Sequence, residues 1–145
     1  MIASCATQAP VATAAGCVSS ADANRQLVSN FYTQALIQKQ VRPAFERYAT
    51  ADFIEHKPDI KSGTREGAIV FLEGLIAQLP QAQWQIVRTV ADADMVALHA
   101  TFRPATGAPE YVIADFFRLE NCRIVEHWDV VAPPATAVGN PNPRI

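Results

Sequence analysis

Residues 111–131 have the sequence YVIADFFRLENCRIVEHWDVV, which predicts two long apolar strands joined by a tight turn. Each strand carries one aspartate within its apolar run, Asp115 in the first strand and Asp129 in the second. Burying an unpaired carboxylate costs roughly several kcal/mol, and the group usually responds with a raised pKa. Asp115 is therefore the first candidate for chemistry, unless it lies at a strand edge and faces water.

The composition favours one soluble domain. The chain has 145 residues and a formal net charge of −2, with acidic and basic residues intermixed. No basic stripe is present to neutralise phosphates, so we expect no nucleic-acid partner. The longest apolar runs have the length of strands, so we expect no membrane partner either.

Residues 1–21 are rich in Ala, Ser, Thr and Pro and lack the basic start and apolar centre of a signal peptide. We predict a flexible leader that can be removed with little loss of stability, and a cytoplasmic protein. The alternative is a periplasmic or secreted protein whose leader remains from an exported precursor. A disulfide between Cys5 and Cys17 would require such an oxidising compartment. Together with Cys122 these cysteines form no CxxC pair, so neither a zinc site nor cysteine catalysis is expected.

The order of the predicted elements indicates an α+β fold. Apolar residues at helical spacing predict a helix over 22–39, a short one from Pro43, and a third from Thr64 to Pro80. After that proline the apolar period changes to two, which predicts a meander of long strands. We expect a domain over 22–132, with the sheet wrapping one face around the helices, and a Pro-rich tail over 133–145.

Four motifs carry a resemblance to a known family: FY in the first helix, FIEHKP, DFFRLENCRIVEHWDVV and GNPNPRI. They resemble the SnoaL-like polyketide cyclase branch of the nuclear transport factor 2-like superfamily, which also contains ketosteroid isomerases. The resemblance implies a cone-shaped, curved, mixed or antiparallel sheet closed by three N-terminal helices around a deep apolar pocket. It also implies a homodimer formed through the outer face of the sheet.

The same resemblance implies roles for individual residues. Asp129 falls where SnoaL-type cyclases keep a general base, and Asp115 falls where ketosteroid isomerases keep a protonated acid in an oxyanion hole. His56 falls where those isomerases keep their aspartate base, and Tyr32 falls near their oxyanion tyrosine. His at position 56 departs from the isomerases, and Asp at position 115 departs from the cyclases, where His is expected.

The residues themselves suggest a division of labour. Asp115 in its apolar strand suits a neutral hydrogen-bond donor, and Asp129 suits a base if His127 pairs with it and keeps it ionised. His56 and His99 are alternative bases or orienting groups, although His99 can equally be a core histidine. Four residues are expected to contact the ligand: Tyr32, His99, Phe117 and His127.

The facing of the two aspartates depends on the strand register. A simple two-residue turn at Asn121 and Cys122 would place Asp115 opposite Trp128 and leave Asp129 on the other face. A bulge or a three-residue loop would bring both aspartates to one face. The resemblance favours this second register, and spacing alone does not decide.

The expected function is that of a cofactor-independent acid/base enzyme, an aldol cyclase, isomerase or lyase, acting on a small apolar carbonyl compound. One alternative is a module that binds a small ligand or dimerises without turnover. A second is water activation of the epoxide-hydrolase type, which is weakened because His99 stands where those enzymes hold an arginine. We expect neither a cofactor nor a metal, since no element contains His and acid at ligand spacing.

Overall fold

The computed structural model describes residue 17, residues 19–136 and residues 139–145. The helical elements are α1 (Ala21–Tyr32), a π-helical turn η1 (Thr33–Ile37), α2 (Val41–Tyr48) and α3 (Arg65–Gln78). The strands are β1 (Ala49–Glu55), β2 (Gln83–Asp92), β3 (Met95–Arg103), β4 (Tyr111–Glu120) and β5 (Arg123–Ala132). No helix in these ranges is long and apolar enough to cross a membrane.

Side-chain caps fix the starts of two helices. The hydroxyl of Ser20 accepts a hydrogen bond from the backbone N–H of Ala23, and that of Thr64 accepts one from Gly67. The first helix does not continue regularly to residue 39 as predicted, because it changes into η1 and ends at Ile37.

The second helix starts earlier than the sequence suggested. It begins at Val41, so that Pro43 stands within its first turn rather than at its start.

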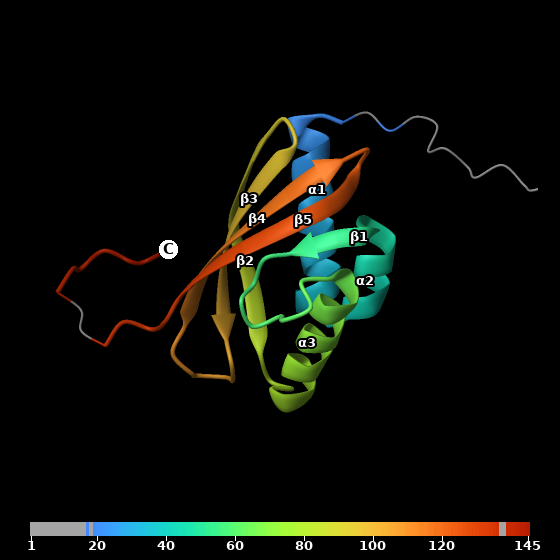
Figure 1. The fold of residues 1–145 in the computed structure, drawn as a ribbon. Helices are drawn as coiled ribbons and strands as arrows, with labels where there is room; N and C mark the ends of the chain where they lie inside the picture. The colour runs from blue at the N-terminus through green and yellow to red at the C-terminus, as the bar shows by residue number, and fades with distance from the viewer. Residues whose placement is uncertain (1–16, 18, 137–138) are drawn as a thin grey trace, which may run out of the picture.

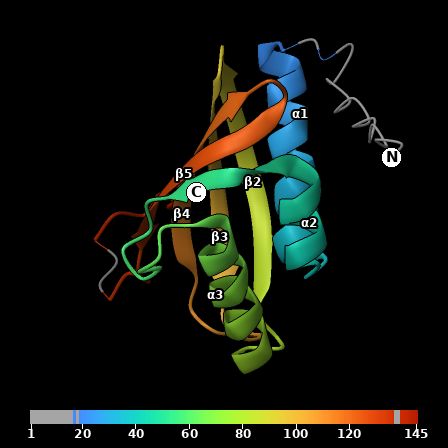
Figure 2. The same ribbon diagram turned by 45° about the vertical axis from the view of Figure 1, so that its right-hand side comes forward.

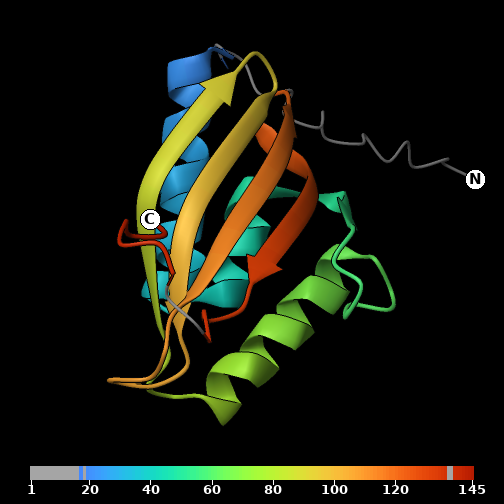
Figure 3. The same cartoon turned by 90° about the vertical axis from the view of Figure 1, so that its left-hand side faces the viewer.

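The five strands form one sheet in the order β1-β5-β4-β3-β2. The β1–β5 pair is parallel and the other pairs are antiparallel, so the sheet is mixed. All three helices lie on one side of this curved sheet (Figures 1 and 2). The opposite side of β2 to β5 carries no helix, as Figure 3 shows. The expected α+β architecture is confirmed.

Aromatic side chains pack the helices against the sheet. Phe31 of α1 makes edge-to-face contacts with Phe45 of α2 and with Phe117 of β4, at centroid distances of 5.0 and 5.7 Å. Phe45 contacts Phe53 of β1 in the same way, at 5.6 Å. The four rings also line the cavity described below, so they hold the walls of the site in place.

The β4–β5 hairpin combines both of the turn geometries considered from the sequence. Asn121 and Cys122 have positive φ values of 47° and 55°, and Glu120 pairs with Arg123 across a two-residue turn. A register shift then occurs in β4 between residues 118 and 119, where β5 carries one extra residue. As a result Asp115 lies directly opposite Asp129.

A disulfide joins Cys17 to Cys122, with the two Cα atoms 6.1 Å apart. It fastens the chain just before α1 to the β4–β5 turn. The alternative pairing of Cys17 with Cys5 is therefore wrong, and Cys5 itself lies outside the described residues. The removal of residues 1–21 without loss of stability stays a prediction, and the half-cystine Cys17 and the Ser20 cap are the two described features that it would delete.

We expect the disulfide to contribute about 2 to 4 kcal/mol, because its two cysteines are 105 residues apart and the bond restricts the unfolded chain. Replacing Cys17 and Cys122 by serine should lower the melting temperature by about 10 °C, measured without reductant. Cys5→Ser is the matched control and should leave it within about 2 °C. Equal melting temperatures for the double variant and the wild type would contradict this assignment.

Candidate active site

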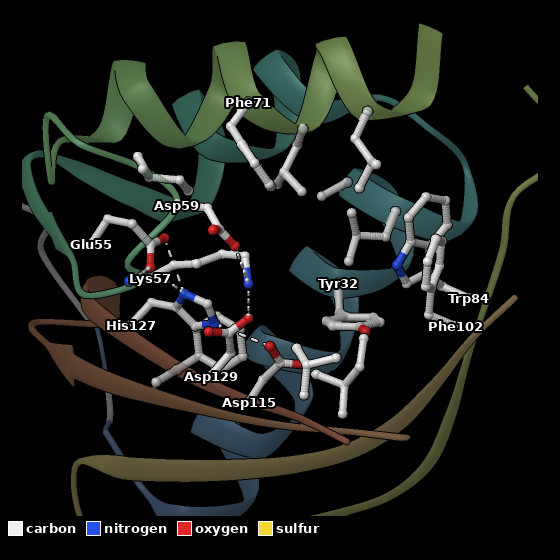
Figure 4. Close-up of a pocket in the computed structure, with 18 of the residues that line it drawn as sticks. Tyr32, Glu55, Lys57, Asp59, Phe71, Trp84, Phe102, Asp115, His127 and Asp129 are labelled. Atoms are coloured by element: carbon white, nitrogen blue, oxygen red, sulfur yellow. Dashed lines mark hydrogen bonds and ion pairs between the residues drawn. The ribbon is translucent and has the colours of Figure 1, made fainter. Parts of the chain in front are cut away.

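An apolar cavity of about 340 Å³ lies between the helices and the concave face of the sheet. Its apolar end is lined by Phe71 and Leu75 of α3, Trp84 of β2 and Phe102 of β3. Its other end gathers seven polar or ionisable side chains, all labelled in Figure 4. They are Tyr32, Glu55, Lys57, Asp59, Asp115, His127 and Asp129.

Asp115 and Asp129 both reach this polar end from the sheet. They form a cross-strand pair, and both line the cavity. Side chains of directly opposed residues have Cβ atoms about 5 Å apart, so two carboxyl groups share one small volume. Two like charges at that distance repel, and each carboxyl therefore needs either a cation or a proton.

Lys57 supplies the cation for Asp129. Its ammonium Nζ donates to Oδ2 of Asp129 at 2.7 Å, and the two side chains are only 19% and 10% exposed. Burial is the largest single influence and lowers the pKa of Lys57, but the hydrogen bond to Asp129, the charge of Asp129 and the nearby Asp59 together raise it by more, so the net direction is upward. The pair is thus an ammonium and a carboxylate. Among the described residues, Oδ1 of Asp129 has no hydrogen-bond partner.

His127 lies between two carboxyl groups. Its Nδ1 is 2.9 Å from Oε1 of Glu55, and its Nε2 is 3.1 Å from Oδ1 of Asp115 (Figure 4). Burial by itself lowers the pKa of His127, but the hydrogen bonds to Asp115 and Glu55 raise it to about 10. The ring is therefore an imidazolium at neutral pH, and both of its N–H groups donate.

Two polar atoms of cavity-lining side chains have no hydrogen-bond partner among the described residues. They are the hydroxyl of Tyr32 and Oδ2 of Asp115, and both are buried. Burial raises the pKa of Asp115, and the bond from His127 offsets only part of this effect. Burial and the neighbouring Asp115 also hold the pKa of Tyr32 well above its ordinary value. Tyr32 is therefore a neutral hydroxyl, and the pKa of Asp115 is displaced upward, in the direction of its protonated form.

Five of the seven residues predicted from the sequence meet in this cavity: Tyr32, Asp115, Phe117, His127 and Asp129. The other two, His56 and His99, lie on the opposite face of the sheet. His56 stacks on Trp128 at a centroid distance of 4.7 Å and bonds Glu126, and His99 bonds Arg88. Neither can reach a ligand in the cavity.

The expected partner of Asp129 also differs. His127 does not pair with Asp129, because its two nitrogens are taken by Glu55 and Asp115. The cation that holds Asp129 comes instead from Lys57, which sequence reasoning missed.

Strand alternation could have identified the two missed residues, Glu55 and Lys57. Phe53 is 3% exposed and faces the core, whereas Ile54 is 46% exposed. Continuing the alternation puts Glu55 and Lys57 inside and His56 outside. The resemblance of the motif FIEHKP favoured His56, whereas the alternation of side chains along β1 indicates Glu55 and Lys57.

Across the described residues, no cluster of His, Cys, Asp and Glu is arranged to hold a metal ion.

A curved mixed sheet, three helices on its concave face and an apolar cavity with an acidic end define a class of small α+β domains. The sequence profile of the SnoaL-like domain matches residues 28–127, more than half of the chain. The chain therefore belongs to the SnoaL-like domain family. No curated protein sequence matches it.

Solved structures show the same fold. AclR from Streptomyces galilaeus, described as a candidate hydroxylase, is 18% identical with a TM-score of 0.65, covering 78% of this chain and 91% of its own. IdmH from Streptomyces antibioticus, described as a candidate polyketide cyclase, is 21% identical with a TM-score of 0.64, covering 74% and 91%. A candidate polyketide cyclase from Acidithiobacillus ferrooxidans is 17% identical with a TM-score of 0.64, covering 79% and 91%.

The pKa of His127 predicts how stability depends on pH. Because its folded-state pKa of about 10 lies above the ordinary value of 6.5, its contribution is complete below pH 6.5 and is lost as the pH rises towards 10. The melting temperature should fall over this range by at least about 4 °C more in the wild type than in His127→Gln. His56→Gln is the control and should retain the wild-type slope. Parallel curves for wild type and His127→Gln would contradict the assignment.

Proposed function

We propose that the protein is a cofactor-independent acid/base enzyme that moves a proton on a carbon atom next to a carbonyl group. One observation carries the proposal: a carboxylate held by Lys57 lies opposite two unpartnered polar atoms in the same apolar cavity. The carboxylate of Asp129 is the base. The hydroxyl of Tyr32 and the protonated Oδ2 of Asp115 are the donors.

In this mechanism Oδ1 of Asp129 takes the proton from the carbon, and the electron pair of the broken C–H bond forms an enolate. The enolate oxygen accepts hydrogen bonds from Tyr32 and Asp115, which are already in place before the charge develops. In an aldol closure the enolate carbon attacks a second carbonyl, whose π electrons move to its oxygen, and that alkoxide takes the proton back from Asp129. In an isomerisation the carbon skeleton instead takes the proton from Asp129 at another position. Charge moves only within the cavity, where the low dielectric strengthens these hydrogen bonds.

The cavity supports a small, largely apolar substrate. Its apolar end offers aromatic and aliphatic walls, and its polar end offers one place for a carbonyl oxygen. Membership of the SnoaL-like family, and neighbours described as candidate polyketide cyclases, support a cyclase-type reaction over isomerisation or elimination. No geometric observation favours epoxide hydrolysis, since His99 lies outside the cavity.

Asp129→Asn should lower kcat/KM by at least about a hundredfold, because the amide cannot accept the proton. Asp115→Asn should retain part of the activity, since an amide N–H still donates to the enolate oxygen. Both should be measured with a carbonyl compound that the wild type turns over. Asp52→Asn, on the exposed surface of β1, is the charge-matched control.

A substrate is not needed to begin. The anion of 4-nitrophenol mimics the enolate, so Tyr32→Phe should weaken its binding by about tenfold through loss of one donor to a charged oxygen. Asp129→Asn should bind it at least as tightly as the wild type. If Asp129→Asn retained full turnover, a non-catalytic role for Asp129 would follow, as in a protein that only binds its ligand.

We also propose that the protein forms a homodimer through the outer face of the sheet. That face carries no helix (Figure 3) and exposes Phe116 and Val130, which are 37% and 64% exposed, beside Trp128. An apolar patch flanked by ion pairs such as Arg118–Glu126 is typical of a protein interface.

Light scattering should give a dimer at micromolar concentration, and Val130→Lys should shift it towards monomer by placing a charge in the patch. Val70→Lys provides a matched control, since Val70 is similarly exposed, at 58%, but lies on α3. A monomeric wild type would contradict the proposal.

The Cys17–Cys122 disulfide supports a periplasmic or secreted location over the cytoplasm. Cytosolic thiols are kept reduced, and disulfides persist in oxidising compartments. The free-thiol content of the protein taken from its native cells distinguishes the two locations.

A further inference from the structure

The two carboxyl groups that contact His127, those of Glu55 and Asp115, receive different numbers of hydrogen-bond contacts. Glu55 receives three contacts from donors, because His127 Nδ1 lies 2.9 and 3.0 Å from its two oxygens and the backbone N–H of Lys57 donates to Oε1 at 2.9 Å. Asp115 receives one hydrogen bond of good geometry, from His127 Nε2 to Oδ1 at 3.1 Å, and its Oδ2 has no partner of that kind among the described residues. The neutral Tyr32 hydroxyl lies close enough to Asp115 for this carboxyl group to raise the pKa of Tyr32. Hydrogen-bond donors stabilise the ionised form of a carboxyl group, so the negative charge belongs on Glu55.

With Asp115 protonated, the buried charges of the polar end balance in pairs. Lys57 and Asp129 neutralise each other, and the His127 imidazolium is neutralised by Glu55. An ionised Asp115 would be an excess charge in an apolar cavity, which is costly. Asp115 therefore keeps its proton, and that proton can lie on Oδ2, the oxygen that His127 does not contact.

We propose that Glu55 is a positioning residue that acts through His127 to keep Asp115 protonated and able to donate a hydrogen bond to the ligand. The inference rests on the proposed function for the use of that hydrogen bond, but the protonation state itself can be measured without any substrate. If the charge of Glu55 were removed, His127 would have Asp115 as its only remaining acidic partner. Asp115 would then give up its proton, because the ordinary pKa of histidine exceeds that of aspartic acid.

Among the described residues, no other charged group lies where it could replace Glu55 as the acidic partner of His127. Among the described residues that line the cavity near Asp115, α1 contributes the neutral Tyr32 and β5 contributes His127 and Asp129. The segment after β1 contributes Lys57, which is paired, and Asp59, which is 68% exposed. The cavity-lining residues of α3, β2 and β3 are apolar or aromatic, such as Leu72, and carry no charge.

The test is Glu55→Gln, which preserves the shape of the side chain. Carbon NMR of protein labelled at the aspartate carboxyl groups, with the Asp115 signal assigned through Asp115→Asn, reports the ionisation of Asp115. In the wild type we expect this group protonated at pH 6, and in Glu55→Gln we expect it ionised. Glu126→Gln is the matched control: this glutamate also bonds a histidine, His56, but on the outer face, and Asp115 should stay protonated.

Binding of the 4-nitrophenol anion gives a second readout. At pH 7 it should weaken by at least about tenfold in Glu55→Gln, because one donor is lost and a carboxylate faces the anion instead. When the affinity is calculated for the free phenolate present at each pH, lowering the pH should restore it as Asp115 regains its proton. A merely structural role of Glu55 would not produce this recovery.

A protonated Asp115 in folded Glu55→Gln, with the wild-type midpoint, would overturn the proposal. If Glu55→Gln does not fold, His127→Gln tests the same coupling from Glu55 through His127 to Asp115. Without the imidazolium the ionisation midpoint of Asp115 should rise above that of the wild type, and an unchanged midpoint would refute the coupling. These results concern Asp115 alone, so they stand apart from the turnover of Asp129→Asn, on which the proposed function depends.

Discussion

Asp115 and Asp129 lie opposite each other across the β4–β5 hairpin, and this pairing determines which charges the other side chains of the polar end must carry. Two carboxyl groups on one apolar face cannot both be ionised without nearby cations. The bulge after Arg118 creates this opposition, since a regular ladder from the same turn would have put Asp129 on the outer face. A single extra residue in β5 therefore decides whether the cavity holds one acid or two.

The surrounding elements supply the cations and hydrogen-bonding groups that these two carboxyl groups need. The end of β1 runs parallel to β5, which brings Glu55 beside His127 and lets Lys57, two residues further on, reach Asp129. Pro58 comes next and restricts the backbone of Lys57 to extended angles. The first helix places Tyr32 at the point where it changes into η1, and such π-helical turns are frequent at functional sites. Polar groups thus enter the cavity from three separate parts of the chain.

The sequence was sufficient for the fold because local signals agreed with one another: two capped helices, a change of period after Pro80 and two long apolar strands. It also identified Asp115 and Asp129, since an acid in an apolar run is conspicuous. It was less informative for the network around them. The pairing of Lys57 with Asp129 spans 72 residues and depends on the parallel alignment of β1, which no local pattern reveals. Likewise, Cys17 and Cys122 show no pairing signal in their spacing.

The Cys17–Cys122 bond has a practical consequence for handling the molecule. The turn that holds Cys122 and the cavity-lining Tyr111 and Val131 stand at opposite ends of the hairpin, some ten residues and about 30 Å apart. Residue 17 therefore stands at the end of the hairpin remote from Tyr111 and Val131. A dye attached near the β4–β5 turn would stand far from these two cavity-lining residues, whereas one attached just after β5 would begin beside them.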